Sequence, residues 1–172
     1  MKEFGMSVIY VAFWGIAAQL IGPLLPRKWF DAQRFPYAAF EFEEDGKIYS
    51  AMRVQKWKKK LPDISRFSKR MRPKRISTMS SKDIDALVAE TCVAEFVHVA
   101  LSVLSFAVLR FWKNRYGVIF VALYILVGNV PYIIIQRYNR PQLIRVAGRL
   151  RRRECGISGE GTHTVMQHGR GA

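Results

Sequence analysis

Two ionisable residues, Glu95 and His98, lie inside one of the most apolar stretches of the chain, residues 92–111. They are three positions apart, so a helix places them on one face. An ionisable side chain in the middle of a membrane helix costs about 2.5–3.5 kcal/mol on insertion scales, so this face must meet protein or water. A histidine oriented by a carboxylate can take a proton from an alcohol, which is the general-base half of acyl transfer. The pair therefore indicates a membrane enzyme, although a hydrogen-bonded pair that only locks helices together is the alternative.

The pair belongs to a longer polar stripe with spacings of four, three, four and three. Its members are Thr91, Glu95, His98, Ser102 and Ser105. A second apolar stretch, 117–135, carries Asn129 six residues before its end, and His98 lies six residues after Cys92, where its own stretch begins. An antiparallel pair of helices therefore brings His98 level with Asn129. We expect the Asn129 amide to donate to a developing oxyanion, unless it only satisfies backbone freed by the neighbouring Pro131.

Basic residues lie just beyond the polar pocket that we expect between His98 and Asn129. Arg137 and Arg140 follow the third apolar stretch, and the cluster 56–60 precedes the second. Guanidinium groups bind phosphates well, so we expect Arg137 and Arg140 to contact a thioester donor, either acyl-CoA or an acyl carrier protein. A second Glu-x-x-His pair and further carboxylates are missing, so no metal is expected. We expect no cofactor beyond the donor and no nucleic-acid partner.

The elements that must position these residues are three apolar segments, 6–25, 92–111 and 117–135. About 20 residues of helix span a hydrocarbon core of roughly 30 Å. The net charge is +15 while 50% of residues are hydrophobic, and the two properties occupy separate blocks. Because Lys and Arg concentrate in the loop 26–83 and after residue 135, both are expected in the cytoplasm, with the N-terminus outside the cell membrane. The prediction is an all-α integral membrane fold of one domain, 1–153; a re-entrant hairpin of spans two and three is the alternative.

The cytoplasmic loop carries further signals. Residues 39–52 contain Asp45-Gly46 and alternate in places, which predicts a short β-hairpin. Residues 54–75 are basic with interleaved aromatic residues, which predicts an amphipathic segment at the membrane surface. Ser80 to Asp83 predict the start of the helix that enters span two. The glycine-rich stretch 154–172 is expected to be a disordered tail.

The sequence from Asn129 to Leu143, NVPYIIIQRYNRPQL, resembles a signature of the glycosyl-4,4'-diaponeurosporenoate acyltransferase family. Two further blocks are similar: Glu90-Thr91 with Ala94-Glu95 and His98, and Val54-x-Lys-Trp-Lys-x-Lys with Asp63. The resemblance covers about residues 26–152. It implies transfer of a fatty acyl group to a glucose hydroxyl of a glycosylated carotenoid.

Carried over by position, the resemblance implies a set of candidate site residues besides His98, Glu95 and Asn129. They are Glu90, Gln136, Arg137, Asn139, Arg140, Trp57, Lys58 and Asp63. His98 is expected to act as base and Glu95 to orient it. The glycine-rich tail and the residues Cys92-Val93 depart from the family pattern. The tail and the lack of any carotenoid-specific signal leave the acceptor open. A non-catalytic membrane subunit or lipid-binding protein is the alternative function, and a membrane methyltransferase is a third.

Overall fold

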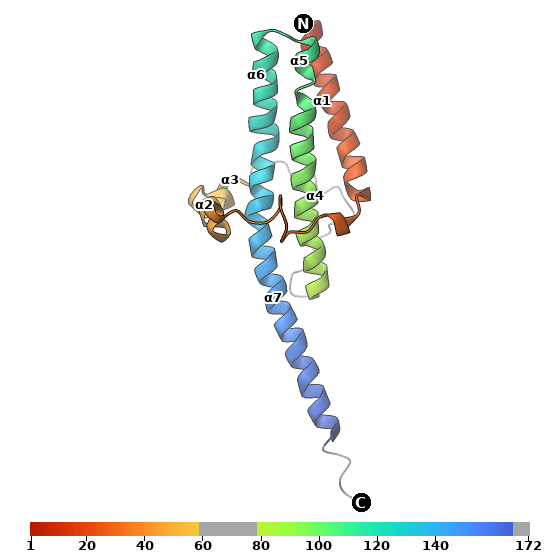
Figure 1. Cartoon of the computed structure of the whole chain (residues 1–172), viewed down its shortest axis with the longest axis vertical. Helices are drawn as coiled ribbons and strands as arrows, with labels where there is room; N and C mark the ends of the chain where they lie inside the picture. Colours follow the sequence, from red (N-terminus) through yellow and green to blue (C-terminus); the bar gives the residue numbers. More distant parts are fainter. Residues whose placement is uncertain (59–78, 167–172) are drawn as a thin grey trace, which may run out of the picture.

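A computed structural model describes residues 1–58 and 79–166, and these residues form helices and turns without a strand. Helix α1 (Lys2–Ile21) lies beside α4 (Ser81–Ser105), and α5 (Val108–Phe111) continues the direction of α4 (Figure 1). The chain then reverses into α6 (Arg115–Leu123), the π-helix η8 (Tyr124–Asn129) and the long α7 (Val130–Met166). Three of these stretches, Lys2–Leu24, Ser81–Phe111 and Arg115–Gly156, are long and apolar enough to cross a membrane. The prediction of three membrane-length helices is confirmed.

Helix α4 begins where the sequence predicts. The Ser80 side chain accepts a hydrogen bond from the Asp83 amide, and the Asp83 carboxylate accepts one from the Ser80 amide at 3.0 Å. This reciprocal capping box satisfies amides that the first helical turn leaves without partners. It fixes the start of α4 well before the apolar stretch that begins at Cys92.

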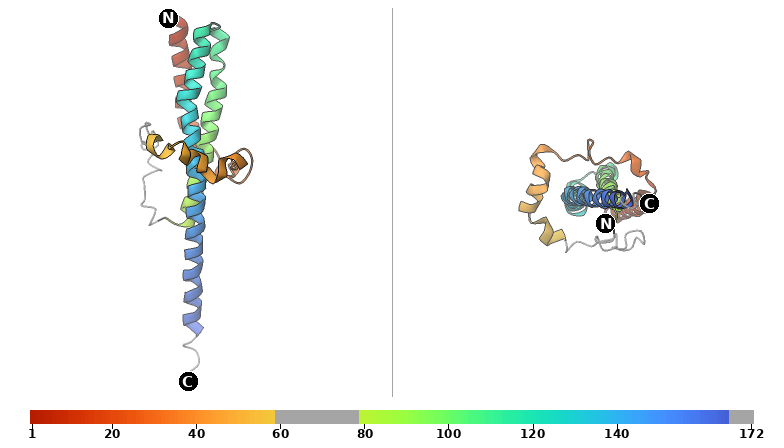
Figure 2. Two further views of the ribbon diagram at one scale, coloured as in Figure 1. Left: turned by 90° about the vertical axis from the view of Figure 1, so that its left-hand side faces the viewer. Right: turned by 90° about the horizontal axis from the view of Figure 1, so that it is seen from below.

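Residues 26–58 form a belt around the bundle. The belt contains the short helices η2 (Arg27–Trp29), η3 (Glu41–Gly46), α2 (Lys47–Ala51) and α3 (Val54–Trp57), and it follows η1 (Gly22–Leu24) at the end of α1. Seen along the bundle axis, the belt curves around α4 and α7 (Figure 2). It crosses α4 and α7 at the end of α1 that lies away from the α5–α6 turn, and both α4 and α7 continue beyond it (Figure 1). Small apolar clusters fix it to the helices, Phe30 against Cys92 and Val93, and Tyr49 and Val54 against Tyr138.

The predicted β-hairpin is wrong. Residues 41–51 are helical, because Glu43 is turned inward instead of alternating outward along a strand. Its carboxylate accepts hydrogen bonds from the Tyr49 hydroxyl, six residues later, and from Arg137 of α7. These contacts curl the segment into η3 and α2, and burying a charged group demands such partners.

Two other expectations lie partly outside the described residues. The amphipathic segment 54–75 begins as α3, but its remainder from residue 59 onward lies outside them. Helix α7 continues to Met166, past residue 153, where the sequence predicts the domain to end. The disorder expected for 154–172 stays a prediction.

Candidate active site

A layer of buried charge joins α4, α7 and the belt. Glu95 of α4 accepts a hydrogen bond from Nε of Arg137 at 2.8 Å and another from Arg140, both of α7. Arg140 is only 3% exposed and Glu95 only 5%. Because buried charges are costly unless they are paired, this contact fixes the register of α4 against α7.

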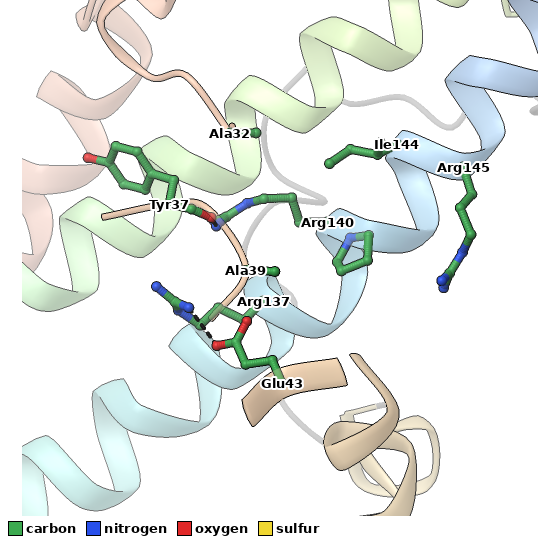
Figure 3. Close-up of a pocket in the computed structure, with 9 residues that line it drawn as sticks. Ala32, Tyr37, Ala39, Glu43, Arg137, Arg140, Ile144 and Arg145 are labelled. Atoms are coloured by element: carbon green, nitrogen blue, oxygen red, sulfur yellow. Dashed lines mark hydrogen bonds and ion pairs between the residues drawn. The ribbon is translucent and has the colours of Figure 1, made fainter. Parts of the chain in front are cut away.

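The belt completes the layer. Arg137 also donates to the Glu43 carboxylate and, at 2.7 Å, to the carbonyl of Pro36 (Figure 3). Arg140 donates to the carbonyl of Tyr37 at 2.6 Å. Two carboxylates and two guanidinium groups thus balance in charge, and their hydrogen bonds tie the belt to the helix pair.

Arg140 has further bonds to α4 itself. Its Nε donates to the Thr91 hydroxyl at 2.9 Å, and an Nη donates to the Thr91 carbonyl. The lower end of the predicted stripe, Thr91 and Glu95, is therefore the surface that receives the arginines of α7. The upper end, Ser102 and Ser105, donates to carbonyls of its own helix.

One turn of α4 deeper, His98 faces α7. Its Nδ1 lies 3.0 Å from Oδ1 of Asn129, and its ring stacks on Tyr132 with centroids 4.8 Å apart and planes inclined by 6°. The amide nitrogen of Asn129 donates to the Tyr124 carbonyl at 3.1 Å. This bond turns the Asn129 oxygen toward the imidazole, so Nδ1 is the protonated nitrogen and Nε2 keeps its lone pair. The predicted level placement of His98 and Asn129 is confirmed.

The π-helix η8 presents Asn129 at this position. Pro131 follows two residues later, and a proline has no amide hydrogen and crowds the carbonyl four residues before it. A π-helical turn before the proline accommodates this lost bond, and such turns occur often at functional sites. Asn129 contacts His98 and also satisfies a backbone carbonyl, but that carbonyl belongs to Tyr124 and is not the one that Pro131 leaves without an amide partner.

A pocket of about 170 Å³ opens beside the charged layer, between the belt and α7 (Figure 3). Its apolar wall consists of Ala32, Ala39, Pro141 and Ile144, and its polar wall of Tyr37, Glu43, Arg137, Arg140 and Arg145. Burial, the largest cause, together with the hydrogen bond to Glu43, raises the pKa of the nearby Tyr49 hydroxyl well above its usual value. Tyr49 therefore stays a neutral donor that holds Glu43 in place.

The other predicted site residues occupy separate positions on the belt side of the bundle. Glu90 forms an ion pair with Arg27, with 2.8 Å from Nε to the carboxylate. Asn139 accepts a hydrogen bond from Lys58 at 3.0 Å, and the Lys58 ammonium also lies over the Tyr138 ring.

Three predicted residues remain, and of these the two described ones, Trp57 and Gln136, form no hydrogen bond with His98 or Asn129. Trp57 donates to the Met52 carbonyl within the belt, and Gln136 is half-buried on α7. Asp63 lies outside the described residues.

The roles expected for the charged residues change. Glu95 does not orient His98; its carboxylate accepts from Arg137 and Arg140, because two cations attract it more strongly than a neutral imidazole does. Arg137 and Arg140 do not form a free rim for donor phosphates, since both are committed to carboxylates and carbonyls. One N–H of the Asn129 amide nitrogen donates to the Tyr124 carbonyl, and the oxyanion role expected for the other N–H stays a prediction.

Sequence reasoning missed two contributors, Glu43 and Arg145, and placed Tyr132 on the face of Asn129 without giving it a role. Glu43 is 94 positions from Arg137, and no local pattern links the two. Tyr132 follows Asn129 by three residues and so shares its helix face, which is a usable signal. Among the described residues, no group of three His, Cys, Asp or Glu lies close enough to hold a metal ion. The absence of a metal site stays an expectation.

Three membrane-length helices, joined by a buried ionic layer and a histidine between α4 and η8, define the class as a small helical membrane protein. The family model for glycosyl-4,4'-diaponeurosporenoate acyltransferase matches residues 26–149. Two curated relatives of that name, from Staphylococcus aureus strains bovine RF122 / ET3-1 and MRSA252, are each 31% identical over 160 residues. Each match covers 89% of this chain and 95% of the relative. No solved structure matches the chain.

The chain therefore belongs to the glycosyl-4,4'-diaponeurosporenoate acyltransferase family, and it is an enzyme that transfers acyl groups. The matched region contains the belt, all of α4 and the part of α7 that carries Arg137 and Arg140.

Proposed function

We propose that this enzyme moves a fatty acyl group from a cytoplasmic thioester to a hydroxyl of a glycosylated lipid, with His98 as general base. The observation that carries the proposal is the hydrogen bond between His98 Nδ1 and Asn129 Oδ1. It places the ring proton on Nδ1 and leaves Nε2 as the basic atom. No cofactor beyond the donor takes part.

The proposed reaction is direct transfer. Nε2 of His98 takes the proton of the acceptor hydroxyl as its oxygen bonds to the thioester carbonyl carbon. The carbon–sulfur bond then breaks, and the leaving thiolate takes the proton from the imidazolium. The products are an ester and a free thiol, and His98 returns to its starting state. Asn129 and Tyr132 act as positioning residues that hold the imidazole.

The pocket beside the belt suits the entry of the thioester. The excess of Lys and Arg in the belt and after residue 135 favours a cytoplasmic location for this end of the bundle. Asn129 and Arg145 are 16 residues apart on one continuous helical stretch, about 24 Å along its axis. A donor that enters at Arg145 and reaches His98 must therefore be long and linear, as the pantetheine arm of a thioester donor is.

The acceptor class is taken from the relatives, whose name specifies a glycosyl diaponeurosporenoate. For this chain we propose a sugar hydroxyl of such a glycosyl carotenoid. The exposed apolar surfaces of α1, α4 and α6 can contact lipid chains, as an acceptor dissolved in the bilayer requires.

The test is acyl transfer by the purified enzyme in lipid nanodiscs, with palmitoyl-CoA and a glucosylated carotenoid acid as substrates. Replacing His98 with Ala should lower kcat by about 10²–10⁴-fold while the protein stays folded. The matched control is Ser102→Ala, one turn away on the same stripe, which should retain activity. Unaltered transfer by a folded His98→Ala variant would exclude His98 as the base. It would support a seam that only locks the helices.

A further inference from the structure

Helix α7 carries a line of exposed arginines beyond the bundle. Arg145, Arg149 and Arg152 are four and three residues apart, so they lie on one face of the helix. Arg149 donates to the backbone carbonyl of Arg145, a contact that leaves its charge uncompensated. In the described part of the chain, no ion pair involves any of these three arginines. We call them the arginine face.

This face points away from the partner helix. The side of α7 that meets α4 carries the buried Ala147, Arg151 bound to Asp85, and Glu154 bound to the Ser81 hydroxyl and amide. Arg151 on that side is paired with Asp85, whereas the three arginines on the outer side form no ion pair with any described carboxylate. The arginine face is therefore not needed to hold α7 against α4.

The arginine face lies too far from the hydrocarbon to serve as a headgroup anchor. The apolar stretch of α7 ends at Ile135, and at 1.5 Å per residue Arg145, Arg149 and Arg152 follow at about 15, 21 and 25 Å. The headgroup layer extends only about 5–8 Å beyond the hydrocarbon on each side. Attraction of exposed charges decays within about 8–10 Å at physiological salt. Arg149 and Arg152 therefore face the aqueous compartment.

The arginine face begins at the pocket. Arg145 lines the pocket together with Ile144 and Pro141, and the face continues from there along about 10 Å of helix. Of the three arginines that line the pocket, Arg137 and Arg140 are committed to Glu43 and Glu95. A small donor with several phosphates would thus find one uncompensated cation here, whereas a protein with an acidic surface could cover all three.

We infer that the arginine face docks an acidic carrier protein, which delivers the acyl chain through the adjacent pocket as a thioester on its prosthetic arm. This inference rests on the proposed function and specifies its donor. Charge complementarity identifies the partner, because an uncompensated cationic surface outside the headgroup layer attracts an anionic one.

The test compares two donors, palmitoyl-CoA and an acyl carrier protein charged with palmitate, on the enzyme in nanodiscs of zwitterionic lipid. The double variant Arg149→Glu, Arg152→Glu, which leaves the pocket-lining Arg145 in place, should raise KM for the carrier-bound donor by about tenfold or more, with kcat preserved. KM for palmitoyl-CoA should change less than about twofold. Direct binding of the carrier, measured by fluorescence anisotropy, should weaken in parallel and should weaken with added salt in the unaltered enzyme.

A matched control reverses two exposed cations at the opposite end of the bundle, Lys113→Glu and Arg115→Glu. It makes the same change in net charge and should leave both KM values unaltered. An equal rise in KM for both donors, or unchanged carrier binding, overturns the inference. So does an effect seen only in nanodiscs that contain anionic lipid, because the arginines would then contact headgroups.

The failure of the proposed function has a different signature. If the unaltered enzyme uses neither thioester, the proposed reaction fails, and with it the role of the arginine face in delivering a donor. If palmitoyl-CoA is used and the carrier neither binds nor donates, the inference alone fails and the reaction stands.

Discussion

The Nδ1 atom of His98 lies 3.0 Å from Oδ1 of Asn129, across the contact between α4 and the π-helix η8. The other end of the Asn129 amide is bound to the Tyr124 carbonyl, so the side chain has one orientation. This arrangement parallels the carboxylate that orients the histidine of a hydrolase triad, with a neutral amide in its place. A neutral orienter avoids a second charge at a depth where charge is costly.

The first prediction concerns this orienting bond. Asn129→Leu keeps a side chain of similar size but removes the acceptor for His98 Nδ1. The imidazole can then adopt the other tautomer, and kcat should fall by about 10–10²-fold, the range that loss of an orienting partner produces for metal-bound histidines. KM for either substrate should change little. The measurement is steady-state acyl transfer, with Ser105→Ala on the polar stripe as control; an Asn129→Leu variant with normal kcat would remove Asn129 from the mechanism.

The second prediction concerns the buried ionic layer. Arg140→Met leaves Glu95 with one cationic partner in a site that is 5% exposed. Breaking a buried pair in this way should lower the free energy of unfolding by about 3–5 kcal/mol. Arg27→Met is the matched control, because the Arg27–Glu90 pair is about one third exposed and should contribute only about 0–1 kcal/mol. Equilibrium unfolding in mixed detergent measures both, and equal losses would contradict the assignment of a buried layer.

The third prediction separates the belt from the helices. Glu43→Gln removes the carboxylate through which Arg137 holds η3, and hydrogen bonds to charged groups contribute about 1.5–3 kcal/mol. The belt should then open locally without unfolding the bundle. Hydrogen exchange of the amides from 36 to 49 should quicken by about tenfold or more, while exchange in α4 stays slow. The control is Glu41→Gln, two residues earlier and exposed. Uniform acceleration throughout the chain would show that Glu43 stabilises the whole fold instead.

Several features of this fold could be predicted from sequence because they depend on local patterns. The lengths of the apolar stretches predicted the three spans, and the Ser80–Asp83 capping box predicted the start of α4. The equal depth of His98 and Asn129 in their apolar stretches predicted the contact between them. The partners of Glu95 could not be predicted in the same way. The spacing of Glu95 to His98 is a local pattern, so it suggested that these two residues contact each other. Arg137 and Arg140 instead reach Glu95 from α7, and they pair with its carboxylate in place of His98.

The belt was mispredicted for a related reason. Residues 39–52 contain a turn dipeptide that favours a hairpin, but a hairpin of two strands is marginal in water without a surface to cover it. Here the segment covers α7 instead, and the inward Glu43 decides its conformation. The guanidinium partner of Glu43, Arg137, is 94 positions away and leaves no trace in the local pattern.

The fourth prediction concerns alkaline pH. Burial, followed by the hydrogen bond to Glu43, raises the pKa of Tyr49 above its usual value near 10. For an acid whose pKa is raised on folding, the stabilisation is complete below the unfolded pKa and is lost as pH rises through the folded one. Tyr49 should therefore remain protonated, and the belt attached, at a pH where exposed tyrosines have ionised.

The measurement is ultraviolet absorbance of phenolate during a titration. The unaltered enzyme should show one fewer tyrosine ionising near pH 10 than the variant Glu43→Gln, which lacks the acceptor charge and in which the belt opens. Ionisation of Tyr49 near pH 10 in the unaltered enzyme would show that its hydroxyl is not held against Glu43.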